Sequence, residues 1–186
     1  MPEFSPPYHP VPILETARLR LRALQASDFD EYFELSKHPD VYRYLTGSEP
    51  SEEAMWTVAL RLTGHWALQG FGFWGVEEKA SGRFIGVLGF ADARRDIEPS
   101  IKGFPEMGWV LAAHAHGQGY ASEGVAAALA WAEAHFGPVR IVCLMDAANL
   151  ASRRVAEKFG FKEFARTTYH GEPSLLLERL PASAGS

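Results

Sequence analysis

The chain is poor in several features that would narrow its function at once. It has one cysteine, Cys143, so an intramolecular disulfide is impossible and a reducing, cytoplasmic location is expected. No run of residues is long and apolar enough to span a bilayer. The start, MPEFSPPYHPVP, lacks the basic and apolar regions of a signal peptide. Basic residues do not outnumber acidic ones, since the formal net charge is −5, and this argues against a nucleic-acid partner.

The length of 186 residues is typical of one domain with a full hydrophobic core. Five prolines among the first twelve residues predict an extended lead-in over 1–14. The ending PASAGS predicts a loose tail over 182–186. A single folded domain is therefore expected over 15–181.

The first third of the chain contains one strand pattern and two helix patterns. Leucine alternates with arginine in ARLRLRAL, which predicts a half-buried strand over 17–24. Ser27, with Asp30 three residues later, resembles a capping box before an amphipathic helix that ends at His38. Ser51, followed by two glutamates, predicts the start of a second helix, and Gly70 is a suitable C-cap.

The rest of the chain alternates between strands and helices. The period-two segments at 72–79 and 83–93 flank a Ser-Gly turn and predict a hairpin. A strand over 104–111, a helix from about 120 to 136 and an apolar strand over 139–146 form a unit that favours a parallel pair. A helix over 149–160 and strands over 164–170 and 174–180 follow. The sequence thus predicts an α/β fold with a mixed central sheet of about six to seven strands and helices on both faces.

The segment HAHGQGYASEG connects the strand at 104–111 to the next helix and carries two glycines one residue apart. Backbone N–H groups at a helix N-terminus bind anions, and glycines allow a ligand to approach closely. A simple turn explains the same glycines. The nucleotide P-loop would require Gly-Lys-Ser/Thr, but Tyr120 follows Gly119, and the dinucleotide motif would require a glycine where Ser122 stands.

The motifs around this loop resemble one family. GQGYASEG, preceded by EMGWVL and followed by NLASRRVAEKFGF, is similar to the acetyl-CoA-binding core of the GNAT N-acetyltransferases. The opening ETARLRLR adds a resemblance to the RimJ/RimL group, which acetylates ribosomal proteins at an N-terminal alanine. The three motifs ETARLRLR, GQGYASEG and NLASRRVAEKFGF, in this order, resemble that group far more specifically than any one of them does. The resemblance extends over nearly the whole chain.

The resemblance implies a GNAT fold in which one strand diverges from its parallel neighbour, and it implies acetyl-CoA as cosubstrate with no metal. The pantetheine arm would lie in the gap as an added strand, and the loop amides would hold the pyrophosphate. His114 stands where the family has glutamine or arginine. The residues implied to bind acetyl-CoA are Trp109, Val110, Leu111, Gly117, Gln118, Gly119, Tyr120, Ala121, Asn149 and Ser152.

Two side chains are candidates for the chemistry of acetyl transfer. Glu106 shares a strand face with Phe104, Gly108 and Val110, and a carboxylate in such surroundings suits a general base; a solvated or salt-bridged glutamate is the alternative. Relatives often protonate the thiolate with a tyrosine where this chain has Ala156. The resemblance instead implies Ser152 as proton donor, with a role only in CoA binding as the alternative.

The carbonyl oxygen of the acetyl group needs a hydrogen-bond donor in the transition state. The backbone N–H of Val110 or Leu111 is the natural choice. Glu123, in the first turn of the helix after the glycines, would repel a pyrophosphate, so its side chain is expected to point away from the ligand.

Other reactive or charged side chains have plain structural explanations. Arg153 and Arg154 either reach the CoA phosphates or form a solvated helix face, and the second explanation is favoured. His114 and His116 lack a third nearby ligand and make a poor metal site. Cys143 lies in an apolar strand and is expected in the core.

The sequence therefore predicts an acetyl-CoA-dependent N-acetyltransferase acting by direct transfer in a ternary complex. The acceptor is a primary amine, either the α-amino group of a protein or a small molecule, and no nucleic acid or membrane is expected as a partner. A non-catalytic acyl-CoA-binding or sensor module on the same fold is the alternative. A homodimer is compatible with the resemblance, since dimers are common in the group.

Overall fold

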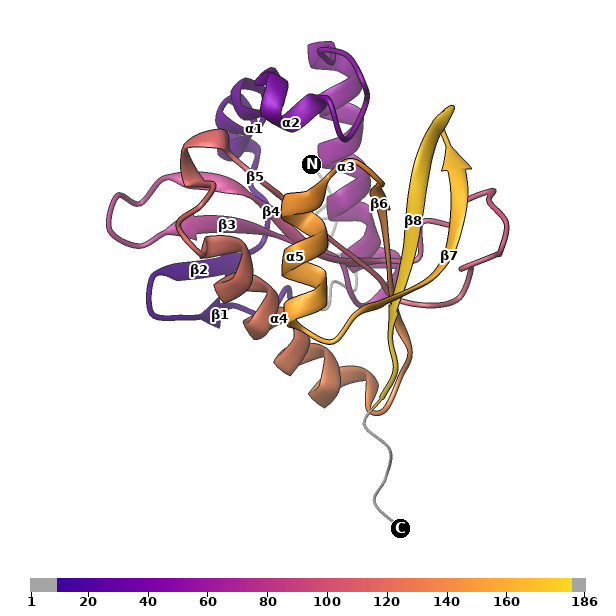
Figure 1. The fold of residues 1–186 in the computed structure, drawn as a ribbon. Coiled ribbons are helices and arrows are strands. Elements are labelled where there is room, and N and C mark those ends of the chain that lie inside the picture. Colours follow the sequence, from indigo (N-terminus) through magenta and orange to yellow (C-terminus); the bar gives the residue numbers. More distant parts are fainter. Residues whose placement is uncertain (1–9, 182–186) are drawn as a thin grey trace, which may run out of the picture.

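The computed structural model describes residues 10–181, which form one continuous sheet flanked by helices (Figure 1). The sheet has eight strands in the order β1-β2-β3-β4-β5-β6-β8-β7. The predicted tail and residues 1–9 of the predicted lead-in lie outside the described residues. The strands are β1 Leu14–Glu15, β2 Leu19–Arg22, β3 Phe73–Glu78, β4 Phe84–Ala91, β5 Glu106–Leu111, β6 Ile141–Asp146, β7 Lys162–Tyr169 and β8 Glu172–Arg179.

The sheet is mixed, as predicted. Every neighbouring pair of strands is antiparallel except β5 and β6, which are parallel. The helix α4 Tyr120–Phe136 connects these two parallel strands, because a parallel pair needs a crossover that returns the chain to the same end of the sheet. β6 is central, as expected, and Val142 and Cys143 within it are fully buried.

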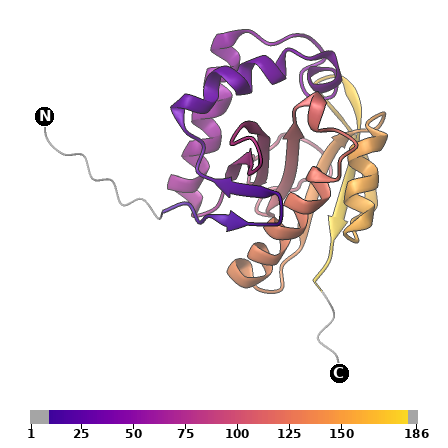
Figure 2. The same ribbon diagram turned by 90° about the vertical axis from the view of Figure 1, so that its left-hand side faces the viewer.

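The helices cover both faces of the sheet (Figure 2). On one face lie α1 Phe29–Ser36, the short α2 Pro39–Tyr42 and α3 Glu52–Gln69, which share a hydrophobic cluster with β4. On the other face lie α4 and α5 Leu150–Lys158, which pack against the central strands. The mixed α/β architecture with flanking helices is therefore confirmed.

The sequence signals explain why these helices form where they do. The Ser51 side chain accepts a hydrogen bond from the Ala54 N–H, and Gly70 ends α3 in the left-handed conformation at φ 73°, so both predicted caps of this helix are confirmed. Along α4, small and apolar residues face the strands at helical spacing and are at most 4% exposed. They are Val125, Ala128, Leu129 and Ala132.

The N-terminal predictions need two corrections. Ser27 and Asp30 do not form a capping box; Asp28 instead accepts from the Gln25 backbone N–H at 2.8 Å and is also bound by Arg22, and this carboxylate organises the start of α1. The first helix ends at Ser36, close to the predicted end at His38, but the sequence analysis missed the short helix α2 that follows. His38 caps α2 through Nδ1, and proline at the first helical position is compatible with a helix start.

Candidate active site

The loop before α4 adopts the conformation that its glycines allow. Gly117 has φ 73° and Gly119 has φ 83°, both in the left-handed region that disfavours other residues, and Gly119 is the N-cap of α4. A Cβ at Gly117 would meet nothing within 4 Å, and one at Gly119 would meet only the Arg18 guanidinium, at 3.5 Å. The glycines therefore serve the backbone conformation and leave open space beside the helix N-terminus, as an anion site requires.

Glu123 is tied to the β1–β2 turn, away from this space. Its carboxylate accepts hydrogen bonds from Thr16 Oγ1 at 2.6 Å, from the Arg18 backbone N–H at 2.7 Å and from Arg18 Nε at 2.7 Å. The prediction that Glu123 points away from a ligand in the loop is confirmed. The acid is thus neutralised locally, and the positive end of the α4 dipole stays available.

The edge of β5 that faces β6 opens into a gap. The two strands pair at Glu106 and Val142, and no further pair of their residues is in register. Directly after β5, the Ala112 N–H donates to the Ile85 carbonyl oxygen in β4. In an antiparallel pair, every second residue directs its N–H and C=O to the partner strand, so the backbone N–H and C=O of Val110 also face β4. Those of Trp109 and Leu111 face the gap. Of the two amides predicted as donors to the acetyl oxygen, Leu111 N–H is therefore the one that faces the gap.

His116 closes the loop against the end of β5. Its Nε2 lies 2.9 Å from the Leu111 carbonyl oxygen, and because a carbonyl only accepts, Nε2 carries the proton. His116 and His114 diverge, since His116 borders the main pocket and His114 borders a separate groove beside α1. Among residues 10–181 no three histidine, cysteine, aspartate or glutamate side chains gather as a metal site would require.

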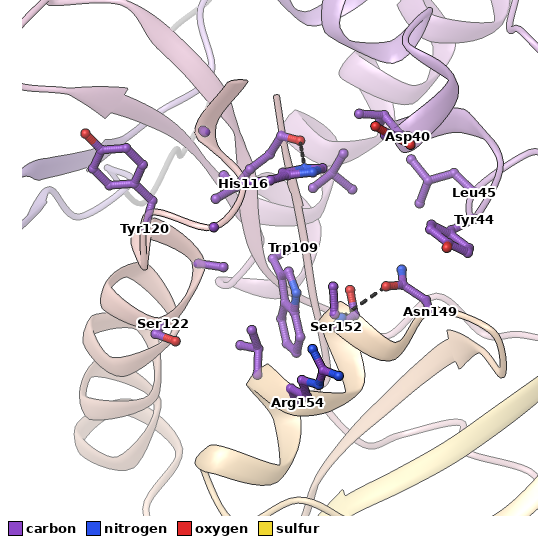
Figure 3. A pocket seen from close by; sticks show the side chains of 18 of the residues that line it. Asp40, Tyr44, Leu45, Trp109, His116, Tyr120, Ser122, Asn149, Ser152 and Arg154 are labelled. Atoms are coloured by element: carbon purple, nitrogen blue, oxygen red, sulfur yellow. Dashed lines mark hydrogen bonds between the residues drawn. The ribbon is translucent and has the colours of Figure 1, made fainter. Parts of the chain in front are cut away.

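The N-terminus of α5 forms the second side of the gap (Figure 3). Asn149 is its N-cap, and its Oδ1 accepts from the Ser152 backbone N–H at 3.0 Å. Arg153 pairs with Glu157 at 2.8 Å and turns away from the gap. Arg154 is exposed, as expected of a solvated helix face, and it also borders the pocket.

These elements enclose one pocket of about 480 Å³, a volume in the range of ligand sites. The remaining side of the pocket comes from α2 and the turn after it, which the sequence gave no reason to place here. Figure 3 shows three of these side chains, Asp40, Tyr44 and Leu45, across the pocket from Trp109. The residues on this side of the pocket are Asp40, Val41, Arg43, Tyr44 and Leu45.

Most residues that the sequence analysis named as binding acetyl-CoA come together around this pocket. Gln118, named for binding, and Glu106, named as the base, do not border it. Gln118 directs its side chain to the His114 carbonyl, at 2.7 Å, and Glu106 lies at the closed end of the gap. Those that border the pocket are Trp109, Val110, Leu111, Gly117, Gly119, Tyr120, Ala121, Asn149 and Ser152.

Glu106 has a charged partner that the sequence did not reveal. Arg95, from the loop between β4 and β5, binds its carboxylate through Nε to Oε2 and through Nη2 to Oε1, both at 2.7 Å. Glu106 is buried, with 9% of its surface exposed. The expected apolar surroundings of this carboxylate are therefore wrong, because a buried carboxylate requires a compensating charge.

Comparisons with known proteins agree with this geometry. The sequence profile described as "Acetyltransferase (GNAT) domain" matches residues 18–162. The uncharacterised protein YkkB of Bacillus subtilis is 30% identical over 171 residues, which cover 89% of this chain and 94% of that protein. A putative GNAT-family acetyltransferase from Bordetella pertussis superposes with a TM-score of 0.80 at 31% identity, covering 90% of this chain and 99% of that one.

A structure of RimL, a ribosomal L7/L12 α-N-protein acetyltransferase in complex with coenzyme A, is also similar. Its TM-score is 0.73 at 20% identity, with 91% of this chain and 98% of that chain covered, so it shows the shared fold and no closer relationship.

Within residues 10–181 no helix is long and apolar enough to cross a membrane. The profile match and the similarity to the Bordetella acetyltransferase show that the chain belongs to the acetyltransferase (GNAT) family.

Proposed function

We propose that this protein is an acetyl-CoA-dependent N-acetyltransferase that transfers the acetyl group to a primary amine within a ternary complex. The observation that carries the proposal is the continuity of the pocket. The free edge of β5, the glycine loop at the N-terminus of α4 and the start of α5 all border one space. A ligand with an amide-containing arm and a pyrophosphate matches this sequence of hydrogen-bonding groups.

The residues around the pocket divide the binding of acetyl-CoA among them. The amides of Gly117 to Ala121 and the α4 dipole suit the pyrophosphate. The backbone N–H and carbonyl of Trp109, which face the gap, suit the amides of the pantetheine arm, which would pair with β5 as a further strand would. Arg154 suits a phosphate oxygen, since it borders the pocket with its guanidinium directed to it (Figure 3).

In the reaction, the amine nitrogen forms a bond to the acetyl carbon, and the bond between that carbon and sulfur breaks. Leu111 N–H donates to the carbonyl oxygen as negative charge develops there. Glu106 takes up a proton from the amine through water. Ser152 Oγ donates a proton to the leaving thiolate and receives one from solvent, which restores its hydroxyl. The products are an N-acetylated amine and coenzyme A with a free thiol.

The acceptor that we favour is the α-amino group of a protein N-terminus, because the motif combination resembles the RimJ/RimL group. A small amine is the alternative. A direct screen separates them: acetyl-CoA is incubated with the protein and a panel of peptides with free N-termini, polyamines and amino acids, and free thiol is followed. Each peptide is matched by its N-acetylated form, which should release no thiol above background.

One observation favours a second candidate, a non-catalytic acyl-CoA sensor. The carboxylate of Glu106 is occupied by Arg95 and does not border the pocket. Calorimetric binding of acetyl-CoA without thiol release for any amine would establish the sensor and reject the enzyme. If the protein is an enzyme, Glu106→Gln lowers kcat strongly while acetyl-CoA still binds, and Ser152→Ala with unchanged turnover would limit Ser152 to binding.

A further inference from the structure

The ion pair between Arg95 and Glu106 has the geometry of a fixed, two-point contact. The planar guanidinium presents Nε and Nη2 to the two carboxylate oxygens, both at 2.7 Å. A bidentate contact of this kind fixes the orientation of the carboxylate as well as its distance. The side chains are 23% and 11% exposed, so water screens the pair only in part.

Arg95 is itself held in place from two other segments. Its guanidinium carbon lies 4.6 Å from the ring centroid of Tyr169, the last residue of β7, in a cation–π contact. The loop that carries Arg95 is anchored a few residues later by Ile97 and Ile101, which are buried against β6 and β8. The guanidinium is therefore a fixed group, although it belongs to a loop.

No other charged partner of Glu106 is found among residues 10–181. The Cys143 thiol on β6 is the other titratable group close to it, and burial raises the pKa of that thiol well above its usual value, so the thiol is neutral. Tyr169 faces Arg95. The orientation of the Glu106 carboxylate therefore depends on Arg95.

We propose that Arg95 is a positioning residue for Glu106, with Tyr169 as its support, an inference that rests on the function proposed above. Arg95 holds the carboxylate in one orientation at the closed end of the gap. The contact joins the β4–β5 loop and the start of β5 to the end of β7.

The test compares variants of Arg95 with a matched control. Arg95→Gln removes the charge, and Arg95→Lys keeps the charge but loses the two-point contact. Arg94→Gln is the control, because this neighbouring arginine is 80% exposed and lies 3.8 Å from Asp92. Steady-state rates are measured over pH with the acceptor found in the screen, together with acetyl-CoA binding by calorimetry.

Arg95→Gln should lower kcat by about 10- to 100-fold, the effect expected of a misplaced catalytic group, with the acetyl-CoA affinity unchanged. Arg95→Lys should lose part of kcat, because it keeps the charge but not the two-point contact, and Arg94→Gln should match the wild type. Added guanidinium ion should restore part of the activity of Arg95→Ala, which a purely structural defect would not permit.

Several results would overturn the inference. One is an unchanged kcat in Arg95→Gln. Another is a higher kcat in Arg95→Gln, which would show that Arg95 inhibits the base. If Arg95→Gln does not fold, Arg95→Lys with wild-type kinetics has the same consequence. A wild-type protein that binds acetyl-CoA and acetylates no amine rejects the proposed function and this inference with it, whereas an active wild type with insensitive Arg95 variants rejects this inference alone.

Discussion

Asn149 caps α5, and the proposed function gives it a second task in binding acetyl-CoA that substitutions can separate from the first. Its Oδ1 caps α5 by accepting the Ser152 N–H at 3.0 Å, while its amide nitrogen stays available to a ligand in the pocket. Asn149→Ala removes both groups. Asn149→Ser keeps a capping oxygen and removes the amide nitrogen, and serine caps helices about as well as asparagine.

The expected magnitudes follow from these contacts. Loss of the cap in Asn149→Ala should lower the free energy of unfolding by about 1 kcal/mol, which corresponds to a fall in Tm of about 2–4 °C for a chain of this length. Loss of a hydrogen bond to acetyl-CoA costs about 0.5–1.5 kcal/mol, or about 2- to 10-fold in Kd. Asn149→Ser should show the weaker binding at nearly wild-type stability, and Asn149→Ala should show both effects.

Urea unfolding monitored by tryptophan fluorescence and calorimetric titration with acetyl-CoA measure the two quantities separately. If Asn149→Ser binds acetyl-CoA as tightly as the wild type, the side chain only caps the helix. If Asn149→Ala unfolds at the wild-type urea concentration, the capping argument is wrong. Equal losses of stability in both variants would contradict the division of tasks.

Three further outcomes are expected. Gly119→Ala should lower the free energy of unfolding by about 1–2 kcal/mol and weaken acetyl-CoA binding, because its φ of 83° disfavours a Cβ, whereas Gly82→Ala, at φ 69° in the β3–β4 turn, should lose stability alone in the same unfolding and binding assays. Arg154→Gln should weaken acetyl-CoA binding about 10-fold or more, in a salt-dependent way, and equal binding by Arg154→Gln and the control Arg153→Gln would remove the phosphate contact. Desolvation raises the pKa of Glu123, but hydrogen bonds from the β1–β2 turn outweigh it and hold that pKa below the usual 4.5. The ionised carboxylate therefore stabilises the fold at pH values above 4.5, and this stabilisation is lost as the pH falls through the lowered pKa. Glu123→Gln should therefore be less stable than the wild type at pH 7, with a difference that disappears as acid unfolding curves pass below the lowered pKa; a constant difference would contradict this.

Most of the fold could be predicted because its signals are local. The alternation of leucine and arginine before Leu24, the cap at Ser51 and the stop at Gly70 each depend on neighbours in sequence. The same reasoning failed at Ser27 because Asp28, and not Ser27, organises the start of the helix. Asp28 is held there by Arg22, and the sequence gives no local sign of that contact. It also missed β1, since a two-residue strand in a proline-rich segment has no period to detect.

The candidate site was predicted in its backbone and less well in its side chains. The glycine loop and Asn149 belong to contiguous motifs and both border the pocket, whereas the capping role of Asn149 was not predicted. The contribution of α2 could not be predicted, because no pattern in residues 39–45 distinguishes a pocket side from a surface turn. Two adjacent arginines likewise look alike in sequence, and only the direction of the helix face separates Arg153 from Arg154.

The sequence by itself determined the mixed sheet, the crossover through α4 and a glycine-bearing helix N-terminus, because periodicity, caps and left-handed glycines are properties of short segments. Only the tertiary structure decided that Arg95 binds Glu106 and that Tyr169 supports Arg95. Tyr169 is far from the other two residues along the chain, and no local pattern pairs Arg95 with Glu106, so both contacts depend on how a loop, a strand start and a strand end meet in three dimensions. The two-glycine turn was visible as a possible anion site in the sequence, and the open space beside it was visible only in the fold.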